Sequence, residues 1–311
     1  MSDPAALANR VLKNQRHLSR WAAREGLEAY RLYDRDMPEY ALAIDRYRDW
    51  LHVQVYERRR PLEPEQLAAI RLALAERLEV APAQVVLKER RRQRGTAQYE
   101  RLEGQGPSFS VLERGLRFEV NLTRYLDTGL FLDHRETRRM VRERAAGRTF
   151  LNLFAYTGSF TVYAAAGGAL RTVTVDMSHT YQAWTRRNLV RNGFDDERRH
   201  ALVQSDVLAF LERMRREGAR FDLVVLDPPS FSNSKRMEGA FDVQRDQLEL
   251  LGATLDLLAP GGELFFSTNR QGFRLDPAIG DRASVEEITA QTTPPDFRRH
   301  PPHRCWVLRH P

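Results

Sequence analysis

The sequence predicts an α/β protein in which a doubly wound, mostly parallel sheet follows a smaller α+β domain. Strand-like and helical segments alternate from residue 128 onward, a pattern typical of parallel sheets covered by helices. The strand-like segments there are almost continuously apolar, as expected of strands buried on both faces. Earlier segments mix polar and apolar residues, and a chain of 311 residues can build two cores. We therefore expect one domain over residues 1–125 and a second over residues 126–311.

The first domain is expected to begin with a helix and to consist mainly of short strands. Apolar residues recur at helical spacing over residues 5–24, and prolines near residue 63 introduce a second helix that is expected to end near residue 79. Alternation of aromatic or β-branched residues with polar ones predicts the strands. These are expected over residues 29–34, 40–47, 50–57 and 84–88, with further strand-like segments up to residue 122.

The second domain is expected to contain the parallel sheet. Its strands are expected over residues 149–154, 171–176, 200–206, 221–229, 263–269 and 304–308. Helices are expected up to Ala164 and over residues 180–192, 207–216 and 244–258. Residues 259–262 read Ala-Pro-Gly-Gly and are expected to form a turn. Trp306 is expected in the core.

The protein is basic, which favours a polyanionic partner. Its formal net charge is +7 and its pI about 9.8, so nucleic acid is the first partner to consider; the alternative is that the charge only aids solubility. No apolar run approaches the ~20 residues of a membrane span, and residues 1–20 lack the apolar segment of a secretory signal. Because Cys305 is the only cysteine, an intrachain disulfide and a multi-cysteine zinc site are excluded. We expect a cytoplasmic protein without a metal site.

Polar residues follow three successive strands at the positions where a parallel sheet binds ligands. Gly158 lies in the loop after the first strand, and no G-x-G-x-x-G follows, so the dinucleotide fingerprint fails. Asp176 ends the second strand, 18 residues later, and can accept hydrogen bonds from ribose hydroxyls. Asp206 follows the third and can accept from an adenine amino group, although a strand-end Asp is also a common helix N-cap. Gly158, Asp176 and Asp206, in this order after three successive strands, predict S-adenosylmethionine (SAM) as the ligand. We therefore expect a class I SAM-dependent methyltransferase with a Rossmann-like, mostly parallel seven-stranded sheet.

The loop after the fourth strand is expected to hold the methyl acceptor. It reads Asp227, Pro228, Pro229, Ser230, Phe231, and the two prolines fix φ and remove two amide donors, which makes the loop rigid. Such a loop can hold a planar base, with Asp227 accepting from the base and Phe231 stacking on it. The alternative is a stiff turn with a capping aspartate.

The residues also bear on which atom is methylated. Carbon 5 of a pyrimidine needs a cysteine that adds to the ring, and Cys305 lies far from the motifs in sequence, which argues against that chemistry. An exocyclic amine suits Asp-Pro-Pro followed by an aromatic residue, whereas Ser230 stands in that position. Guanine N7 has a free lone pair and no proton to lose, so positioning could supply most of the rate. Because N7 faces the deep major groove of A-form RNA, the target must be unpaired or flipped out.

Nearly the whole chain resembles the RlmK half of the RlmKL family of large-subunit ribosomal RNA methyltransferases. The resemblance is carried by Tyr30–Asp34 with Met37–Tyr40, Tyr125–Arg135, Leu151–Phe154 with Tyr156–Ser159, Val175–Ser178, Asp227–Pro229, and Phe231–Met237 with Phe241–Arg245. It implies SAM-dependent methylation of guanine N7 in 23S rRNA, at position 2069 in helix 74 in the family's RNA numbering. The sequence leaves open whether the substrate is free 23S rRNA or a large-subunit precursor. The RlmL half is not in this sequence, so a separate RlmL-like protein is a candidate partner.

The resemblance implies roles for individual residues. The cofactor-binding residues would be His134, Arg135, Asn152, Phe154, Tyr156, Thr157, Gly158, Asp176, Met177, Ser178, Asp206 and Asp227. Catalysis would involve Asp227, Pro228, Pro229 and Phe231. RNA contacts would come from Lys88, Arg90, Arg91, Arg92, Arg94, Lys235 and Arg236. His134 could instead be a structural histidine, and the arginine run a solvated edge.

Other functions remain open on the sequence. They are an rRNA methyltransferase of guanine-N2 or cytosine-C5 specificity, a non-catalytic factor that unwinds or assembles rRNA, and a methyltransferase acting on a protein or small molecule. The Gly158, Asp176, Asp206 and Asp227 set argues against a non-catalytic protein, and the basic charge argues against a small-molecule substrate.

Overall fold

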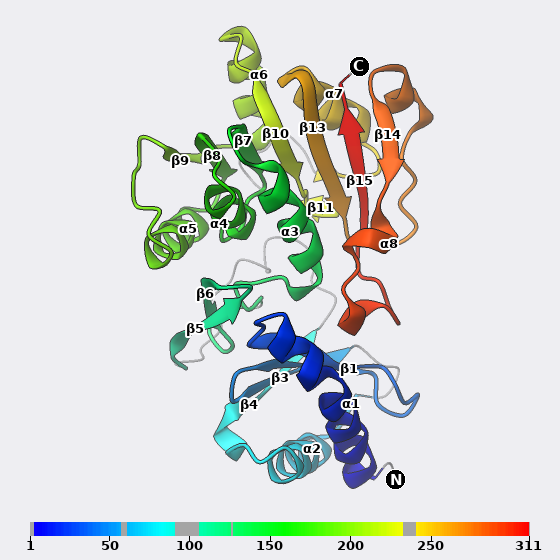
Figure 1. Ribbon diagram of the computed structural model, residues 1–311. Coiled ribbons are helices and arrows are strands. Elements are labelled where there is room, and N and C mark those ends of the chain that lie inside the picture. The colour runs from blue at the N-terminus through cyan, green and yellow to red at the C-terminus, as the bar shows by residue number, and fades with distance from the viewer. Residues whose placement is uncertain (1–2, 57–60, 91–105, 126, 233–240, 311) are drawn as a thin grey trace. The chain divides into compact units, whose positions relative to one another are not determined.

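The computed structural model describes residues 3–56, 61–90, 106–125, 127–232 and 241–310, without the side chains of residues 89 and 90. The chain divides into two compact units (Figure 1). The first comprises residues 1–128 and 295–300, and the second comprises residues 129–294 and 301–311. No helix within the described ranges is both long enough and apolar enough to cross a membrane.

The first unit is built on a four-stranded sheet and a separate hairpin. In chain order its described elements are α1 (Pro4–Arg24), β1 (Ala29–Asp34), β2 (Leu42–Tyr47), β3 (Trp50–Tyr56), α2 (Pro64–Arg77), η1 (Pro82–Gln84), β4 (Val85–Arg90), β5 (Ser108–Glu113), β6 (Leu116–Asn121) and η5 (Pro295–Phe297). Strands β1, β2 and β3 pair antiparallel, and β4 joins β3 in parallel after the crossover through α2. Strands β5 and β6 form the hairpin.

Helix α1 starts where the sequence allows a cap. The side chain of Asp3 accepts a hydrogen bond from the Ala5 amide at 2.9 Å, and Pro4 occupies the first turn, where its missing N–H is not needed. The apolar face of α1, which includes the fully buried Leu7 and Val11, packs into the core of the unit. Each such buried side chain contributes roughly 1.5–3 kcal/mol to folding.

Residues 295–300 belong to the first unit although they come late in the chain. The Asp296 carboxylate accepts from the Arg31 amide at 2.9 Å, and the Phe297 ring lies 4.4 Å from the Arg31 guanidinium. That guanidinium is buried and forms an ion pair with Asp45 at 2.7 Å. The Asp45 charge outweighs the effect of burial and holds the pKa of Arg31 above its usual range. Nothing in the sequence pattern indicated this return of the chain.

The second unit contains the mostly parallel seven-stranded sheet that the sequence predicted. Its described elements are η3 (Leu132–His134), α3 (Arg135–Arg144), β7 (Thr149–Leu153), α4 (Ser159–Ala166), β8 (Arg171–Asp176), α5 (His179–Arg191), β9 (His200–Gln204), α6 (Val207–Arg216), β10 (Phe221–Leu226), β11 (Phe231–Ser232), β12 (Phe241–Asp242), α7 (Gln247–Leu255), β13 (Leu258–Thr268), η4 (Pro277–Asp281), β14 (Ser284–Glu287), α8 (Thr289–Thr292) and β15 (Arg304–Arg309). The strand order is β14-β15-β13-β10-β7-β8-β9, and of these seven only β15 runs against the others.

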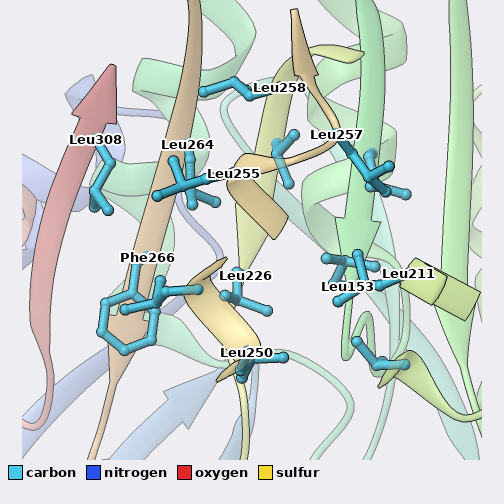
Figure 2. Packing of buried hydrophobic residues seen from close by; sticks show 14 of the residues in the cluster. Leu153, Leu211, Leu226, Leu250, Leu255, Leu257, Leu258, Leu264, Phe266 and Leu308 are labelled. Carbon is cyan, nitrogen blue, oxygen red and sulfur yellow. The ribbon is translucent and has the colours of Figure 1, made fainter. Parts of the chain in front are cut away.

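Both faces of this sheet are buried, which explains the continuous apolar runs in its strands. Alternate residues point to opposite faces: Leu223 and Val225 of β10 pack with α3 and α4, whereas Val224 and Leu226 pack with α6 and α7. Figure 2 shows the second of these clusters, in which Leu226 and Phe266 lie among leucines from several elements. Trp306 belongs to the same core and stacks on Phe266, with ring centroids 5.5 Å apart, as expected.

One predicted turn was wrong. Residues 259–262, expected to form a turn before a strand at residue 263, lie within β13, which begins at Leu258. The parallel pairing of β10 with β13 joins Phe221 to Leu258, shifts register, and resumes between Leu223 and Glu263. The Pro-Gly-Gly residues therefore form an irregular part of β13, because pairing with β10 outweighs their local preference for a turn.

Candidate functional site

The polar residues that follow successive strands are brought to one edge of the sheet of the second unit. Strands β7, β8, β9, β10 and β13 are parallel, so their carboxyl ends share this edge. The chain leaves β7 toward β8 and β9, and then crosses to β10 and β13 on the other side of β7. This reversal of strand order is the place where open α/β sheets bind ligands. The loop of residues 154–158 follows β7 at this point.

The loop of residues 154–158 has an unusual backbone. Phe154, Tyr156 and Gly158 have φ angles of 56°, 52° and 71°, although only Gly158 adopts this region without steric strain. A Cβ atom on Gly158 would come closer than 3.0 Å to Thr185. Residue Gly129 helps to hold the loop, because its amide donates to the Tyr156 hydroxyl at 2.9 Å and its carbonyl accepts from the Thr157 hydroxyl at 2.6 Å. Left-handed residues at a ligand-binding edge are typical of functional loops.

Asp176, at the end of β8, is an anion held by backbone amides. Its Oδ2 accepts from the Tyr156 amide and its Oδ1 from the Ser178 amide, both at 2.8 Å. Burial raises the pKa of this carboxyl to about 6, even though the two amide hydrogen bonds act in the opposite direction. Each oxygen keeps a further lone pair, and additional hydroxyl donors would stabilise the carboxylate. A ribose diol supplies two such donors, so Asp176 fits the role predicted for it.

Other predicted cofactor residues mainly support the loops in this structure. Asn152 is buried and donates to the Thr161 hydroxyl at 3.0 Å. The side chain of Ser178 caps α5, and Asp206 Oδ1 caps α6 by accepting from the Ala209 amide at 3.0 Å. Asp206 remains partly exposed, which leaves its second oxygen for a ligand. The Met177 carbonyl accepts from Gln204 at 3.2 Å, and its side chain is partly exposed.

Asp227, at the end of β10, is held from two sides. The Ser267 hydroxyl, at the end of β13, donates to Asp227 Oδ1 at 2.7 Å. Nε2 of His134 lies 3.5 Å from Asp227 Oδ2. Neighbouring Pro228 is buried, whereas Phe231 is 47% exposed, so the aromatic ring is available for stacking. The Ser230 hydroxyl donates to Asn269 at 2.6 Å and fixes the loop to the end of β13.

His134 belongs to a buried group that the sequence did not reveal. Its ring stacks on His303, with centroids 4.2 Å apart and planes 17° apart. His303 Nδ1 is 2.9 Å from Asp133 and its Nε2 is 3.2 Å from the Thr292 hydroxyl. Burial lowers the pKa of His134, against the attraction of Asp227, so the ring is neutral near pH 7. A neutral ring with its proton on Nε2 faces the carboxylate and leaves Nδ1 as a buried acceptor with no hydrogen-bond partner in the described part of the chain.

The same group resembles a metal site in composition but not in geometry. Single ligand atoms of Asp133, His134 and His303 lie within 4.8 Å of one another. However, an imidazole binds an ion in the plane of its ring, and these two rings are stacked nearly parallel. One ion cannot lie in both planes. The arrangement instead supports His134 through stacking: the His303 ring is held by its contacts with Asp133 and Thr292 and packs against the His134 ring.

The structure places the remaining predicted residues away from an open site or does not describe them. Arg135 is fully buried at the start of α3. Lys88, predicted to contact RNA, is 8% exposed, and its ammonium donates to the Tyr125 carbonyl. Its position favours a role in the fold of the first unit. The other predicted RNA-contacting residues lie outside the described residues, and they are Arg91, Arg92, Arg94, Lys235, Arg236 and the side chain of Arg90.

Three residues of this site were missed by the sequence reasoning: Asp133, Ser267 and His303. Ser267 lies two residues before the end of the strand predicted over residues 263–269, so its place near the ligand edge could have been inferred. Asp133 lies in the family-matching segment Tyr125–Arg135, for which the resemblance implied roles only for His134 and Arg135. His303 is adjacent to no motif, and only the antiparallel return of β15 brings it to His134.

Comparison with known proteins agrees with this geometry. Residues 34–300 match the family model of S-adenosylmethionine-dependent methyltransferases. The ribosomal RNA large subunit methyltransferase K of Neisseria meningitidis is 49% identical over the whole chain and 88% of its own length. The K/L enzyme of Stutzerimonas stutzeri is 55% identical over 97% of this chain, which spans only 42% of that protein.

A solved structure shares the fold over nearly the full length. The crystal structure of SMU.776 in complex with SAH aligns with a TM-score of 0.77 and 24% identity, covering 99% of this chain and 82% of that one. SAM is thus the cofactor that the family model and the Asp176 edge both indicate. From its sequence, its sheet and these matches, the chain belongs to the S-adenosylmethionine-dependent methyltransferase family, among relatives of the large-subunit ribosomal RNA methyltransferases K.

Proposed function

We propose that this chain is a cytoplasmic SAM-dependent methyltransferase of large-subunit ribosomal RNA, and that it methylates guanine N7. The relatives named above as ribosomal RNA large subunit methyltransferases support the substrate class. The family resemblance supports guanine 2069 in helix 74 of 23S rRNA as the target, either in free RNA or in a precursor particle, with a separate RlmL-like protein as a partner. The basic charge of the chain fits a polyanionic substrate.

The surroundings of Asp227 are the observation that supports guanine N7 as the methylated atom. The carboxylate is fixed by Ser267 and flanked by a neutral His134, in a rigid loop whose Phe231 is free to stack on a base. Guanine N7 loses no proton on methylation and becomes cationic. A fixed carboxylate nearby therefore balances the charge of the product, and the stacked, positioned base needs no general base.

The only cysteine of the sequence is unsuited to carbon-5 chemistry. Cys305 is fully buried in β15, and burial together with the Asp227 charge raises the pKa of its thiol above the usual range. A thiolate nucleophile is thus disfavoured at this position.

When bound, SAM supplies an electrophilic methyl group. Asp176 and the loop of residues 154–158 would bind its nucleoside part, with Asp206 near the adenine. Asp227, Pro228, Pro229 and Phe231 would orient the guanine and exclude water from it.

The test is transfer of labelled methyl groups from SAM to protein-free, unmodified large-subunit rRNA, followed by nucleoside analysis and base-resolved mapping. We expect N7-methylguanosine at one position, detectable by borohydride reduction followed by aniline cleavage of the chain at that nucleotide. The variant Asp227→Ala should bind SAM with nearly unchanged affinity and transfer no methyl group, whereas Asp176→Ala should lose SAM affinity. Exclusive formation of 5-methylcytosine or N2-methylguanosine would overturn the proposal.

A further inference from the structure

Helix α1 carries most of the excess positive charge of this protein. Its 21 residues contain Arg10, Lys13, Arg16, Arg20 and Arg24 and no acidic residue, which gives this helix a net charge of +5. The whole chain has a formal net charge of +7, so all residues outside α1 together contribute only +2. The basicity of the protein is therefore concentrated in one element of the first unit.

These cations lie on a single side of the helix. At 100° per residue they fall, together with His17, within an arc of about 120°. The opposite side holds the buried Leu7, Val11 and Ala22. All six polar residues are exposed, and they run along about 21 Å of helix from Arg10 to Arg24. We call this set the α1 stripe: Arg10, Lys13, Arg16, His17, Arg20 and Arg24.

The cations of the α1 stripe lack the acidic partners that several other exposed arginines of the protein have. Arg139 pairs with Glu136 at 3.0 Å, Arg304 with Glu287 at 2.6 Å, and Arg309 with Glu263 at 3.1 Å. Within the ranges that the structure describes, no carboxylate comes within 4.0 Å of a charged nitrogen of the stripe. Beside the carboxyl-terminal half of α1, a hollow of about 360 Å³ contains both signs of charge, from Arg46, Arg48, Glu28 and Asp49. The stripe, in contrast to this hollow, carries positive charge only.

We propose that the α1 stripe binds the phosphate backbone of a base-paired segment of the ribosomal RNA substrate. This inference rests on the proposed function for the class of substrate. A nucleic-acid duplex carries about one charge per 1.7 Å of axis, so the ~21 Å length of the stripe faces a dozen phosphates, of which five guanidinium or ammonium groups can contact a subset. An arginine guanidinium can donate two parallel hydrogen bonds to the oxygens of one phosphate.

A membrane surface fits the stripe less well than RNA. Basic helices that lie on membranes insert their apolar face among the lipid chains. The apolar face of α1 is already buried in the core of the first unit, where Leu7 and Val11 are fully covered. Only the charged side is available, so recognition must be of a charged, hydrated partner.

The experiment compares two triple variants of the full chain. Arg10→Gln, Lys13→Gln and Arg20→Gln remove three charges from the stripe and keep residues of similar helix propensity. Arg213→Gln, Arg215→Gln and Arg216→Gln remove three charges from α6, where Glu212 pairs with Arg216 and Glu217 follows. Binding to protein-free large-subunit rRNA is measured against salt concentration.

We expect the stripe variant to bind at least tenfold more weakly near 0.1 M salt, and the slope of log affinity against log salt to fall by about 2–3. The α6 variant should stay within about twofold of wild type. A third protein with Arg10→Lys and Arg20→Lys keeps the charge and should retain binding. Thermal unfolding and SAM affinity, measured on every variant, identify any loss of fold.

Equal rRNA affinity and salt slope of the two triple variants would overturn the inference. Binding to phosphatidylserine vesicles would also overturn it if wild type and the α6 variant bind them and the stripe variant does not. Such a result would assign the stripe to a membrane surface. If wild type transfers methyl groups to rRNA and the stripe variant does so equally well, the inference fails and the proposed function stands. If wild type binds rRNA through the stripe but transfers no methyl group, the inference about the stripe stands and the proposed function fails.

Discussion

Nε2 of His134 lies 3.5 Å from Oδ2 of Asp227, although the two residues are 93 positions apart in the sequence. His134 comes from the short turn η3 before α3, and Asp227 from the end of β10. Stacking on His303 keeps the imidazole in place. Because burial lowers the pKa of His134, the contact is between a carboxylate and a neutral ring near pH 7. We infer that His134 is a positioning residue for Asp227.

Replacing His134 should therefore slow methyl transfer more than it weakens SAM binding. We expect His134→Phe to lower kcat by about 10–100-fold, because Asp227 loses one of its two supports, which is equivalent to about 1.4–2.7 kcal/mol. SAM affinity, measured by calorimetry, should change less than threefold. His200→Phe is the matched control, since His200 is also buried but lies at the start of β9. Loss of SAM affinity in His134→Phe would place His134 in the cofactor site instead.

SAM affinity should fall in mildly acidic solution. Burial raises the pKa of Asp176 to about 6, so the carboxylate that would accept the ribose hydroxyls becomes protonated as the pH falls through this value. We expect affinity to be constant above pH 7 and about tenfold weaker at pH 5. Isothermal calorimetry across this range measures the effect. Asp176→Asn should bind weakly at every pH, whereas Asp206→Asn should keep the pH dependence; a wild-type affinity that does not change from pH 8 to pH 5 would contradict this role.

Gly158 should tolerate a side chain less well than Gly147, which has nearly the same φ angle. Gly158 and Gly147 have φ angles of 71° and 72°, but a Cβ atom on Gly147 meets no atom within 4 Å, whereas one on Gly158 collides with Thr185. We expect Gly147→Ala to lower the free energy of unfolding by about 1 kcal/mol, through backbone strain alone. Gly158→Ala adds a packing clash and should cost about 2–4 kcal/mol. Urea denaturation compares the two, and equal losses would refute the clash.

Cys305 should be dispensable for the chemistry. The thiol is buried in β15, opposite Ser267 in the strand register, and we expect Cys305→Ala to keep methyl transfer within about threefold. Loss of the buried side chain should lower the free energy of unfolding by about 1–2 kcal/mol. The assay is the rRNA methylation described above. Abolished transfer in a folded Cys305→Ala protein, or covalent trapping on RNA that contains 5-fluorocytosine, would point to a cysteine nucleophile after all.

The sequence alone determined the class of fold and the edge of the sheet that binds ligands. Strands β8 and β1 have the predicted bounds, and so does helix α6, because apolar runs and periodicity are local properties of the chain. Parallel connectivity then requires that Asp176, Asp206 and Asp227 share one edge, whatever the details of packing. The family-matching segments pointed to the same edge.

Only the tertiary structure decided which side chains meet there. The contacts of Asp227 with Ser267 and His134, and that of Asp133 with His303, join residues 40, 93 and 170 positions apart. The tertiary structure also places the Asn152 side chain in the interior and the Lys88 ammonium against the Tyr125 carbonyl. It adds residues 295–300 to the first unit. The physical reason is that periodicity fixes which face of an element is buried, whereas partners across the sequence depend on how strands order and helices pack. His134 and Asp227 meet because α3, which begins directly after His134, packs against β10. His303, which precedes the antiparallel strand β15, stacks on His134, and no local sequence pattern records these contacts.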